Sequence, residues 1–188
     1  MRCWGHWRTV LLLALACLLP LAVTAAGRGL WGVPDEFIDE YDTRARLDHW
    51  AGEQTVVAME YSECKFVCST NWRRLLDIQA LADQQQLPLR FLIISLDPAH
   101  DSPQEWRSYR ALRGMKRSNW SFVTGNRQAT DRVVALLGVK WWLFNDSIMH
   151  DFRLLRLDRE GHILAQMDSY DDPAERFLGL HLATRTTR

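Results

Sequence analysis

The stretch from Thr55 to Cys68 reads TVVAMEYSECKFVC. Its first half is β-branched and apolar, which predicts a buried strand over residues 55–61. Cys64 and Cys68 follow at a spacing of four residues, where a segment with helical periodicity begins. The predicted junction between this strand and this helix therefore carries a pair of cysteines.

Strands and helices alternate along the remaining sequence. Further strands are predicted over 89–96, 121–123, 152–157 and 162–167, the last two forming a hairpin around DREG. Helices are predicted over 69–86, 103–113, 128–137 and 173–182. Ser102, Pro103 and Glu105 form a start signal for the second helix, and Gly138 is a stop signal for the third. This order predicts an α/β domain with a central sheet.

The N-terminus differs from the rest of the chain. Arg2 and Arg8 precede an apolar stretch over 10–23, which small residues follow. This pattern predicts a secretory signal peptide, with an uncleaved membrane anchor as the alternative, although the stretch is short of the roughly 20 residues that a span needs. We accordingly divide the chain into a signal peptide, an irregular N-terminal arm and a folded domain, over 1–26, 27–49 and 50–188.

The composition is that of an ordinary globular protein. It has 23 basic and 23 acidic residues, a net charge of zero and 47% hydrophobic residues. Balanced charge gives no reason to expect nucleic acid or an anionic membrane surface as a partner. We expect a monomer in an exported compartment, the bacterial periplasm, held to a membrane only if the N-terminal segment stays uncleaved.

Removal of the signal peptide would take Cys3 and Cys17 with it, leaving Cys64 and Cys68 as the cysteines of the mature chain. Residues four apart on a helix place their Cβ atoms about 5–6 Å apart, whereas a disulfide needs about 3.5–4.5 Å. A metal ion accommodates this spacing more easily, and two thiolates suit a soft ion such as Cu(I). A redox pair, a structural disulfide and two buried apolar thiols remain open as alternatives.

A third metal ligand would come from a histidine. His100 and His150 are the candidates, because His100 follows the end of a predicted strand and His150 precedes the predicted hairpin. Ligands in α/β sheets gather at strand ends and in the loops beside them. The other histidines after the signal peptide are expected to be solvated surface residues; they are His49, His162 and His181.

Several segments, taken in order, resemble the Sco/SenC/PrrC family of copper-binding, thioredoxin-like proteins. They are YSECKFVC, ISLDPAHDSP, WSFVTG and VALLGV, which begin at residues 61, 94, 120 and 134, and then His150 ahead of DREG. The matches cover about residues 50–184. The resemblance implies a thioredoxin-like fold, with a central mixed sheet flanked by helices, and one copper ion bound by Cys64, Cys68 and His150.

The chain departs from the family pattern beside each ligand. Lys65 and Ser69 occupy positions where the family has proline, and Lys65 places a positive charge beside the thiolates. The family often has aspartate immediately before the histidine, where this chain has Met149, and Asp151 follows instead. We treat Asp151 and Lys65 as candidates for supporting groups around the ligands.

The resemblance implies a copper chaperone that delivers copper to a respiratory cuproprotein, with the binuclear copper centre of cytochrome c oxidase as the client. The alternative is a thiol–disulfide oxidoreductase that uses Cys64 and Cys68 to reduce the client's copper-ligand cysteines. A third interpretation is an interaction module whose site is vestigial. Trp141 and Trp142 either pack in the core or form a client-docking patch beside the metal.

Overall fold

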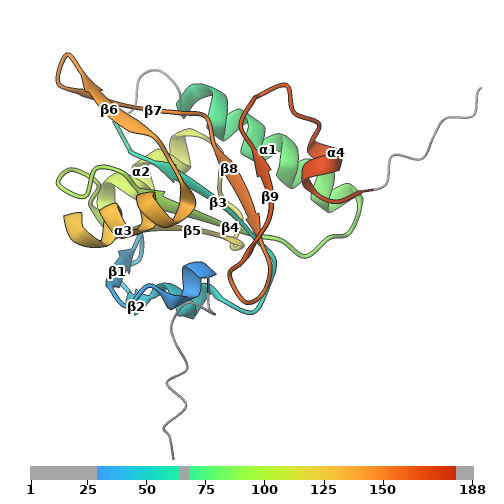
Figure 1. Cartoon of the computed structure of the whole chain (residues 1–188), viewed down its shortest axis with the longest axis horizontal. Coiled ribbons are helices and arrows are strands. Elements are labelled where there is room, and N and C mark those ends of the chain that lie inside the picture. The colour runs from blue at the N-terminus through green and yellow to red at the C-terminus, as the bar shows by residue number, and fades with distance from the viewer. Residues whose placement is uncertain (1–28, 64–67, 181–188) are drawn as a thin grey trace, which may run out of the picture.

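The computed structural model describes residues 29–63 and 68–180, apart from the side chains of Cys68 and Ser69. In this part of the chain a seven-stranded mixed sheet has the strand order β2-β1-β5-β4-β3-β8-β9 (Figure 1). Its strands are β1 (Glu36–Asp39), β2 (Arg44–Arg46), β3 (Thr55–Glu60), β4 (Arg90–Ser95), β5 (Trp120–Thr124), β8 (Leu154–Leu157) and β9 (Ile163–Met167). Neighbours among β3, β4 and β5 are parallel, and the other pairs are antiparallel.

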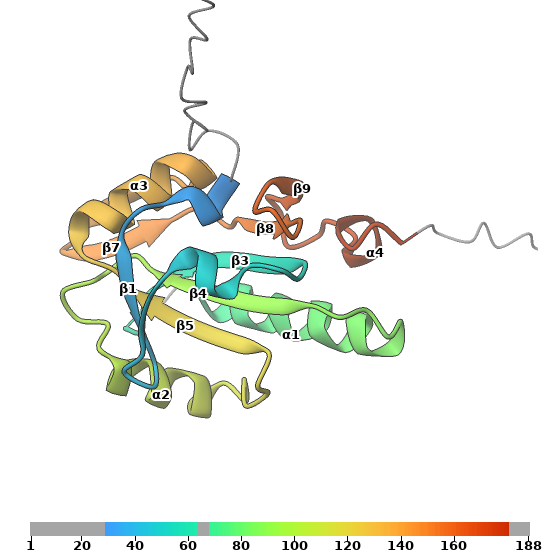
Figure 2. The same ribbon diagram turned by 90° about the horizontal axis from the view of Figure 1, so that it is seen from below.

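Helices cover both faces of this sheet. α1 (Cys68–Gln84) and α2 (Pro103–Leu112) lie on one face, and α3 (Arg127–Leu137) lies on the other (Figure 2). The short helix α4 (Ala174–Phe177) lies beside α1, and the 3₁₀-helices are η2 (Gly29–Gly32) and η3 (Leu47–Trp50). The predicted α/β class, with a central mixed sheet flanked by helices, is therefore confirmed.

The central strands are buried on both faces because β3 and β4 are almost wholly apolar. Val57 and Met59 belong to the apolar cluster on the α3 side, whereas Val56 and Ala58 belong to the cluster beneath α1 and α2. Such continuous apolar runs are typical of parallel strands that helices cover on both sides. The same two-residue alternation points Glu60 toward α1 and α2.

Local signals in the sequence set the helix boundaries. The Oγ of Ser102 accepts a hydrogen bond from the Glu105 amide at 3.2 Å, and α2 begins at Pro103. α3 ends at Leu137, and Gly138 follows with a φ of 67°, a left-handed conformation that glycine adopts without strain. The predicted start of the second helix and the predicted end of the third are both confirmed.

The N-terminal segment differs from its prediction. Instead of an irregular arm over 27–49, its described part contributes β1 and β2 to the edge of the sheet, where β1 pairs antiparallel with β5. Phe37 and Trp31 are buried, and the Trp31 Nε1 donates a hydrogen bond to the Arg159 carbonyl. The expectation was wrong because the acidic residues around Phe37 conceal a short strand whose burial alternates. Residues 1–26, with the predicted signal peptide, lie outside the described residues.

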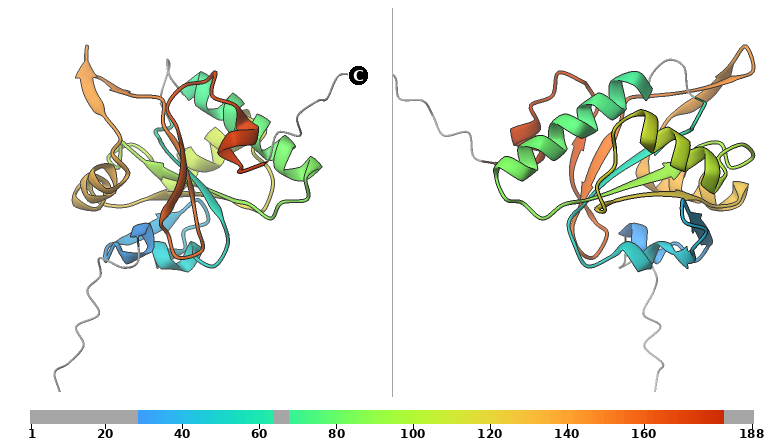
Figure 3. Two further views of the ribbon diagram at one scale, coloured as in Figure 1. Left: turned by 45° about the vertical axis from the view of Figure 1, so that its right-hand side comes forward. Right: turned by 180° about the vertical axis from the view of Figure 1, so that it is seen from behind.

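A hairpin that the sequence did not reveal projects from the body of the molecule. It consists of β6 (Trp141–Phe144) and β7 (Ser147–His150), which pair with each other and not with the main sheet (Figure 3). Asn145 and Asp146 form its two-residue turn with φ angles of 46° and 58°. Positive φ at both positions defines the turn type that matches the twist of paired strands. The hairpin ends at His150.

The C-terminal helix is shorter than predicted. α4 ends at Phe177, and Gly179 follows with a φ of 72°, a conformation that interrupts a helix. Residues 181 and 182 of the predicted helix lie outside the described residues. Among the helices that are described, none has the length and apolar character needed to cross a membrane.

Candidate metal site

His150 is the last residue of β7 and is only 2% exposed. Burial lowers the pKa of its imidazole, so the ring is neutral at pH 7. Its Nδ1 lies 2.9 Å from the main-chain carbonyl oxygen of Asp151. A carbonyl can only accept a hydrogen bond, so Nδ1 carries the proton and Nε2 carries the lone pair. A neutral imidazole of this kind is the form that binds a metal ion.

Tyr61 connects the strand of His150 with the segment that leads to the cysteines. The rings of Tyr61 and His150 meet edge to face, with centroids 6.3 Å apart. The Tyr61 hydroxyl also donates a hydrogen bond to the Ile148 carbonyl of β7. Because Tyr61 stands three residues before Cys64, these contacts hold the approach to the cysteine motif against β7. Sequence reasoning did not single out Tyr61, since both contacts join distant parts of the chain.

Asp101 fixes the turn that precedes Cys64. Its Oδ1 accepts a hydrogen bond from the Ser62 amide at 2.8 Å, and its Oδ2 accepts one from the Ser95 hydroxyl at 2.5 Å. Burial raises the pKa of this carboxyl, while the two hydrogen bonds lower it. Asp101 therefore joins the ends of β3 and β4 beside the site. Its place in the ISLDPAHDSP segment is the signal from which this role could have been found.

The cysteines are only partly within the described residues. Cys68 is the first residue of α1, so its main chain lies at a helix N-terminus, where a thiolate is stabilised. Cys64 and Lys65 lie outside the described residues. In the described part of the chain, no three histidine, cysteine, aspartate or glutamate side chains are grouped so as to hold a metal. Of the predicted ligands, the structure thus places the His150 side chain and the Cys68 main chain.

Asp151 accepts the hydrogen bond of the His150 ring through its main-chain carbonyl. Its carboxylate accepts a hydrogen bond from the Lys140 amide at 3.0 Å and lies 3.8 Å from the guanidinium of Arg153. The hydrogen bond that orients the His150 ring is therefore made to a carbonyl, which fixes the tautomer of the imidazole. Burial has the larger effect on the imidazole pKa and lowers it, whereas the charge of the Asp151 carboxylate raises it.

His100 lies near the same site but in a different environment. It is exposed, and its Nδ1 is 2.8 Å from the Asp97 carboxylate, whose hydrogen bond raises the imidazole pKa. With Tyr61, Glu63 and Ile148, it lines a hollow of about 150 Å³ beside β7. A histidine paired with a carboxylate in solvent is favoured in its charged form, so it suits metal binding less than His150 does.

Glu60 is a buried carboxyl behind the site, at the end of β3. It is 1% exposed, and burial raises its pKa to about 8, against weaker opposing effects of Asn71 and Arg113. Asn71 of α1 and Tyr109 of α2 approach it, but no pair of polar atoms among these three side chains has good hydrogen-bond geometry. Glu60 is therefore protonated at pH 7 and does not add a negative charge to the site.

A central mixed sheet with helices on both faces, and a cysteine at the start of the helix that follows β3, defines a thioredoxin-like protein. The family model described as SCO1/SenC matches residues 25–180. The chain belongs to this SCO1/SenC family.

Individual relatives are distant in sequence. The SCO1 protein homolog of Bacillus subtilis (strain 168) is 22% identical over 148 residues, which are 74% of this chain and 77% of that protein. The copper-bound structure of Arabidopsis thaliana ScoI superposes with a TM-score of 0.67 at 15% identity, covering 77% of this chain and 91% of that one. Copper-bound yeast Sco1 gives a TM-score of 0.64 at 17% identity, with coverages of 77% and 84%. At these identities the solved structures establish the shared fold.

Proposed function

We propose that this protein is a copper chaperone that carries one copper ion between Cys64, Cys68 and His150. Membership of the SCO1/SenC family supports this proposal, as do relatives whose structures contain copper. Two thiolates and one imidazole form a soft, three-ligand set that suits Cu(I). The client is a respiratory cuproprotein, for which we propose the binuclear copper centre of cytochrome c oxidase.

The observation that carries this proposal is the position of a buried, neutral His150 against Tyr61. Sequence separates His150 from the cysteine motif by more than 80 residues, and the fold brings its ring to within 6.3 Å of the ring that precedes the motif. Burying an imidazole costs free energy, which a metal bond would offset. Because His150 comes from a different segment than the two cysteines, a client's ligand can replace the histidine before the thiolates are exchanged.

A Cu(I) titration tests the three-ligand site. The reduced protein is titrated under anaerobic conditions against a chromogenic Cu(I) chelator, as wild type and as His150→Ala. The wild type binds one copper ion, and His150→Ala binds it at least about tenfold more weakly, because even loss of a group that supports a ligand costs about 10–100-fold. The matched control is His162→Ala, which alters an exposed histidine in the β8–β9 turn. Equal Cu(I) affinities of His150→Ala and His162→Ala would contradict the three-ligand site.

A second candidate function is reduction of the client's disulfide. The position of Cys68 at the start of α1 favours it, since a helix N-terminus lowers a thiol's pKa. The Cys64 thiolate would bond to one client sulfur and release the other. The Cys68 thiolate would then displace the client dithiol and leave a Cys64–Cys68 disulfide. The test is the midpoint potential of this pair; failure to form a disulfide, or a potential below that of any dithiol donor, would exclude the role.

The proposed place of action is an exported compartment, the bacterial periplasm. The predicted signal peptide over residues 1–26 supports this, because the basic residues, the apolar stretch and the small residues stand in the order that export signals have. Mass spectrometry of the mature N-terminus, after expression with the native leader, decides between cleavage and an uncleaved anchor.

A further inference from the structure

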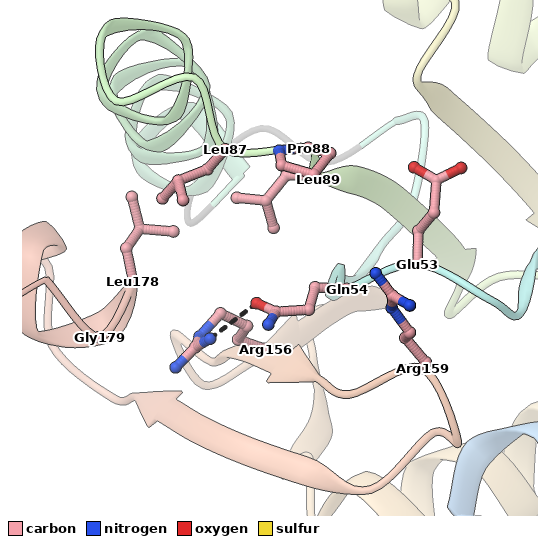
Figure 4. Close-up of a pocket in the computed structure, with 9 residues that line it drawn as sticks. All are labelled: Glu53, Gln54, Leu87, Pro88, Leu89, Arg156, Arg159, Leu178 and Gly179. Atoms are coloured by element: carbon pink, nitrogen blue, oxygen red, sulfur yellow. Dashed lines mark hydrogen bonds between the residues drawn. The ribbon is translucent and has the colours of Figure 1, made fainter.

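A second hollow lies at the opposite end of β3 from the cysteines. It has a volume of about 320 Å³ and is formed by the segments before β3 and β4, the end of β8 and the residues after α4 (Figure 4). β3 is six residues long, so this hollow, the β8–α4 pocket, is about 20 Å from the metal site at about 3.3 Å per residue. A ligand in the β8–α4 pocket would therefore not contact the proposed metal ligands.

One wall of the β8–α4 pocket is apolar. Leu87 and Leu89 precede β4, and Leu178 follows α4; the three side chains converge on one side of the space (Figure 4). Leu89 and Leu178 are anchored in the cluster beneath α1, and Leu87 packs against it. This wall is thus held by the core and offers an aliphatic surface to a ligand.

The other wall carries two arginines, Arg156 and Arg159. Arg156 donates hydrogen bonds to the Phe177 carbonyl at 2.7 Å and to the Gln54 side-chain carbonyl at 2.8 Å, both neutral acceptors. Among the described residues, neither Arg156 nor Arg159 has a carboxylate within ion-pair distance. Glu53, the acidic residue that lines the pocket, pairs with Arg90 at 2.8 Å.

The Arg156 guanidinium is partly buried at the edge of the pocket. This burial lowers the pKa of the guanidinium. Gly179 has a φ of 72°, and a Cβ there would lie 3.1 Å from Nη2 of Arg156. The glycine therefore leaves room for the guanidinium at the edge of the pocket. A half-buried guanidinium without an anion is costly, and a bound oxyanion would offset that cost.

We propose that the β8–α4 pocket binds a small organic anion, a carboxylate attached to a short aliphatic chain. The carboxylate lies between Arg156 and Arg159, and the chain lies on Leu87, Leu89 and Leu178. A volume of about 320 Å³ is at the lower end for ligand pockets and suits a short chain, for which octanoate is the probe. This inference does not depend on copper binding.

Calorimetric titration of the full chain with octanoate tests the proposal. We expect saturable binding of one octanoate, with acetate and octanol each binding at least about tenfold more weakly, because each supplies only one half of the interaction. Equal binding of acetate, or of octanol, would overturn the two-part site. Binding to vesicles that contain phosphatidylglycerol, with no binding of free octanoate, would overturn it in favour of a membrane surface.

Variants locate the site. Arg159→Gln removes an exposed side chain that has no ion pair among the described residues, so we expect the fold to survive and octanoate affinity to fall at least about fivefold. Arg44→Gln, which removes an exposed arginine on β2, is the matched control and should bind octanoate as the wild type does. Thermal unfolding of each variant establishes that it is folded. Equal octanoate affinities of folded Arg159→Gln and Arg44→Gln would overturn the assignment. It would also be overturned if Arg159→Gln lost copper binding together with octanoate binding.

Discussion

Glu60 shows how one residue can depart from the pattern that surrounds it. It closes the apolar run of β3, where the sequence predicts a buried strand, and the structure buries its carboxyl between α1 and α2. Burial raises its pKa from 4.5 to about 8, and Asn71 and Arg113 offset only part of this effect. The folded protein therefore holds a proton on Glu60 at pH values where the unfolded chain has released it.

The first prediction concerns the pH dependence that follows from Glu60. Between pH 5 and pH 8 the folded state binds more protons than the unfolded state, so the free energy of unfolding falls as pH rises through this range. Glu60→Gln keeps the shape and removes the titration. Relative to this variant, the wild type should lose on the order of 3 kcal/mol of stability between the two pH values.

Urea unfolding of wild type and Glu60→Gln at both pH values measures this difference. Other titrating groups are common to the two proteins and cancel in the comparison. Glu160→Gln, in the exposed β8–β9 turn, is the control and should follow the wild type at both pH values. The free energies of unfolding of wild type and Glu60→Gln are compared at each pH. If their difference is the same at pH 5 and pH 8, Glu60 is ionised in the folded protein.

At the scale of elements, the β6–β7 hairpin decides where His150 lies. Trp142, Leu143 and Phe144 stand in consecutive positions and are 50%, 66% and 61% exposed. The sequence left open whether Trp141 and Trp142 pack in the core, and for Trp142 that alternative is wrong. The sequence concealed this hairpin because its exposed strand is apolar at every position, without the alternation that marks a half-buried strand. The Asn145–Asp146 turn was the available signal.

The second prediction is that the turn controls copper binding without touching a ligand. Asp146 has a φ of 58°, whereas proline fixes φ near −65°, so Asp146→Pro should open the turn and displace His150. If His150 is a ligand, as proposed, Cu(I) affinity should fall about tenfold or more. Asp146→Gly is the control, because glycine adopts a positive φ freely and should bind copper as the wild type does. Cu(I) competition measures both.

Unfolding of the Asp146→Pro variant should stay cooperative, since the hairpin is not part of the seven-stranded sheet. Equal copper affinity of the proline and glycine variants would show that the position of His150 does not depend on this turn.

The elements that the sequence predicted well share a physical cause. β3 and β4 are apolar over nearly their whole length, and α2 and α3 carry a cap or a stop residue that acts locally. β1 and β2 were missed because each is three or four residues long and β1 joins the sheet through the distant strand β5. In the site, the resemblance to the family predicted His150 as a ligand. The contacts of His150 with Tyr61 and with the Asp151 carbonyl could not be predicted, because they form only in the folded chain.

At the scale of the whole molecule, the described part of the N-terminal segment is a structural part of the domain. Trp31, Phe37, Leu47 and Trp50 are all buried in the cluster that includes Val57 of β3. The Trp31 Nε1 also donates a hydrogen bond to the Arg159 carbonyl, and β1 pairs with β5 and extends the sheet on that side. A domain boundary at residue 50 would therefore divide a single core.

The third prediction tests this boundary by truncation. Fully burying a large apolar side chain contributes roughly 1.5–3 kcal/mol, so the four side chains together contribute more than about 6 kcal/mol. Domains of this size are typically stable by about 5–15 kcal/mol in total. A fragment of residues 29–188 should unfold cooperatively in urea, whereas a fragment of residues 51–188 should lack fixed tertiary structure by near-ultraviolet circular dichroism. The same urea midpoint for both fragments would show that the core on the α3 side closes without the N-terminal strands, and would restore residue 50 as the start of the folded unit.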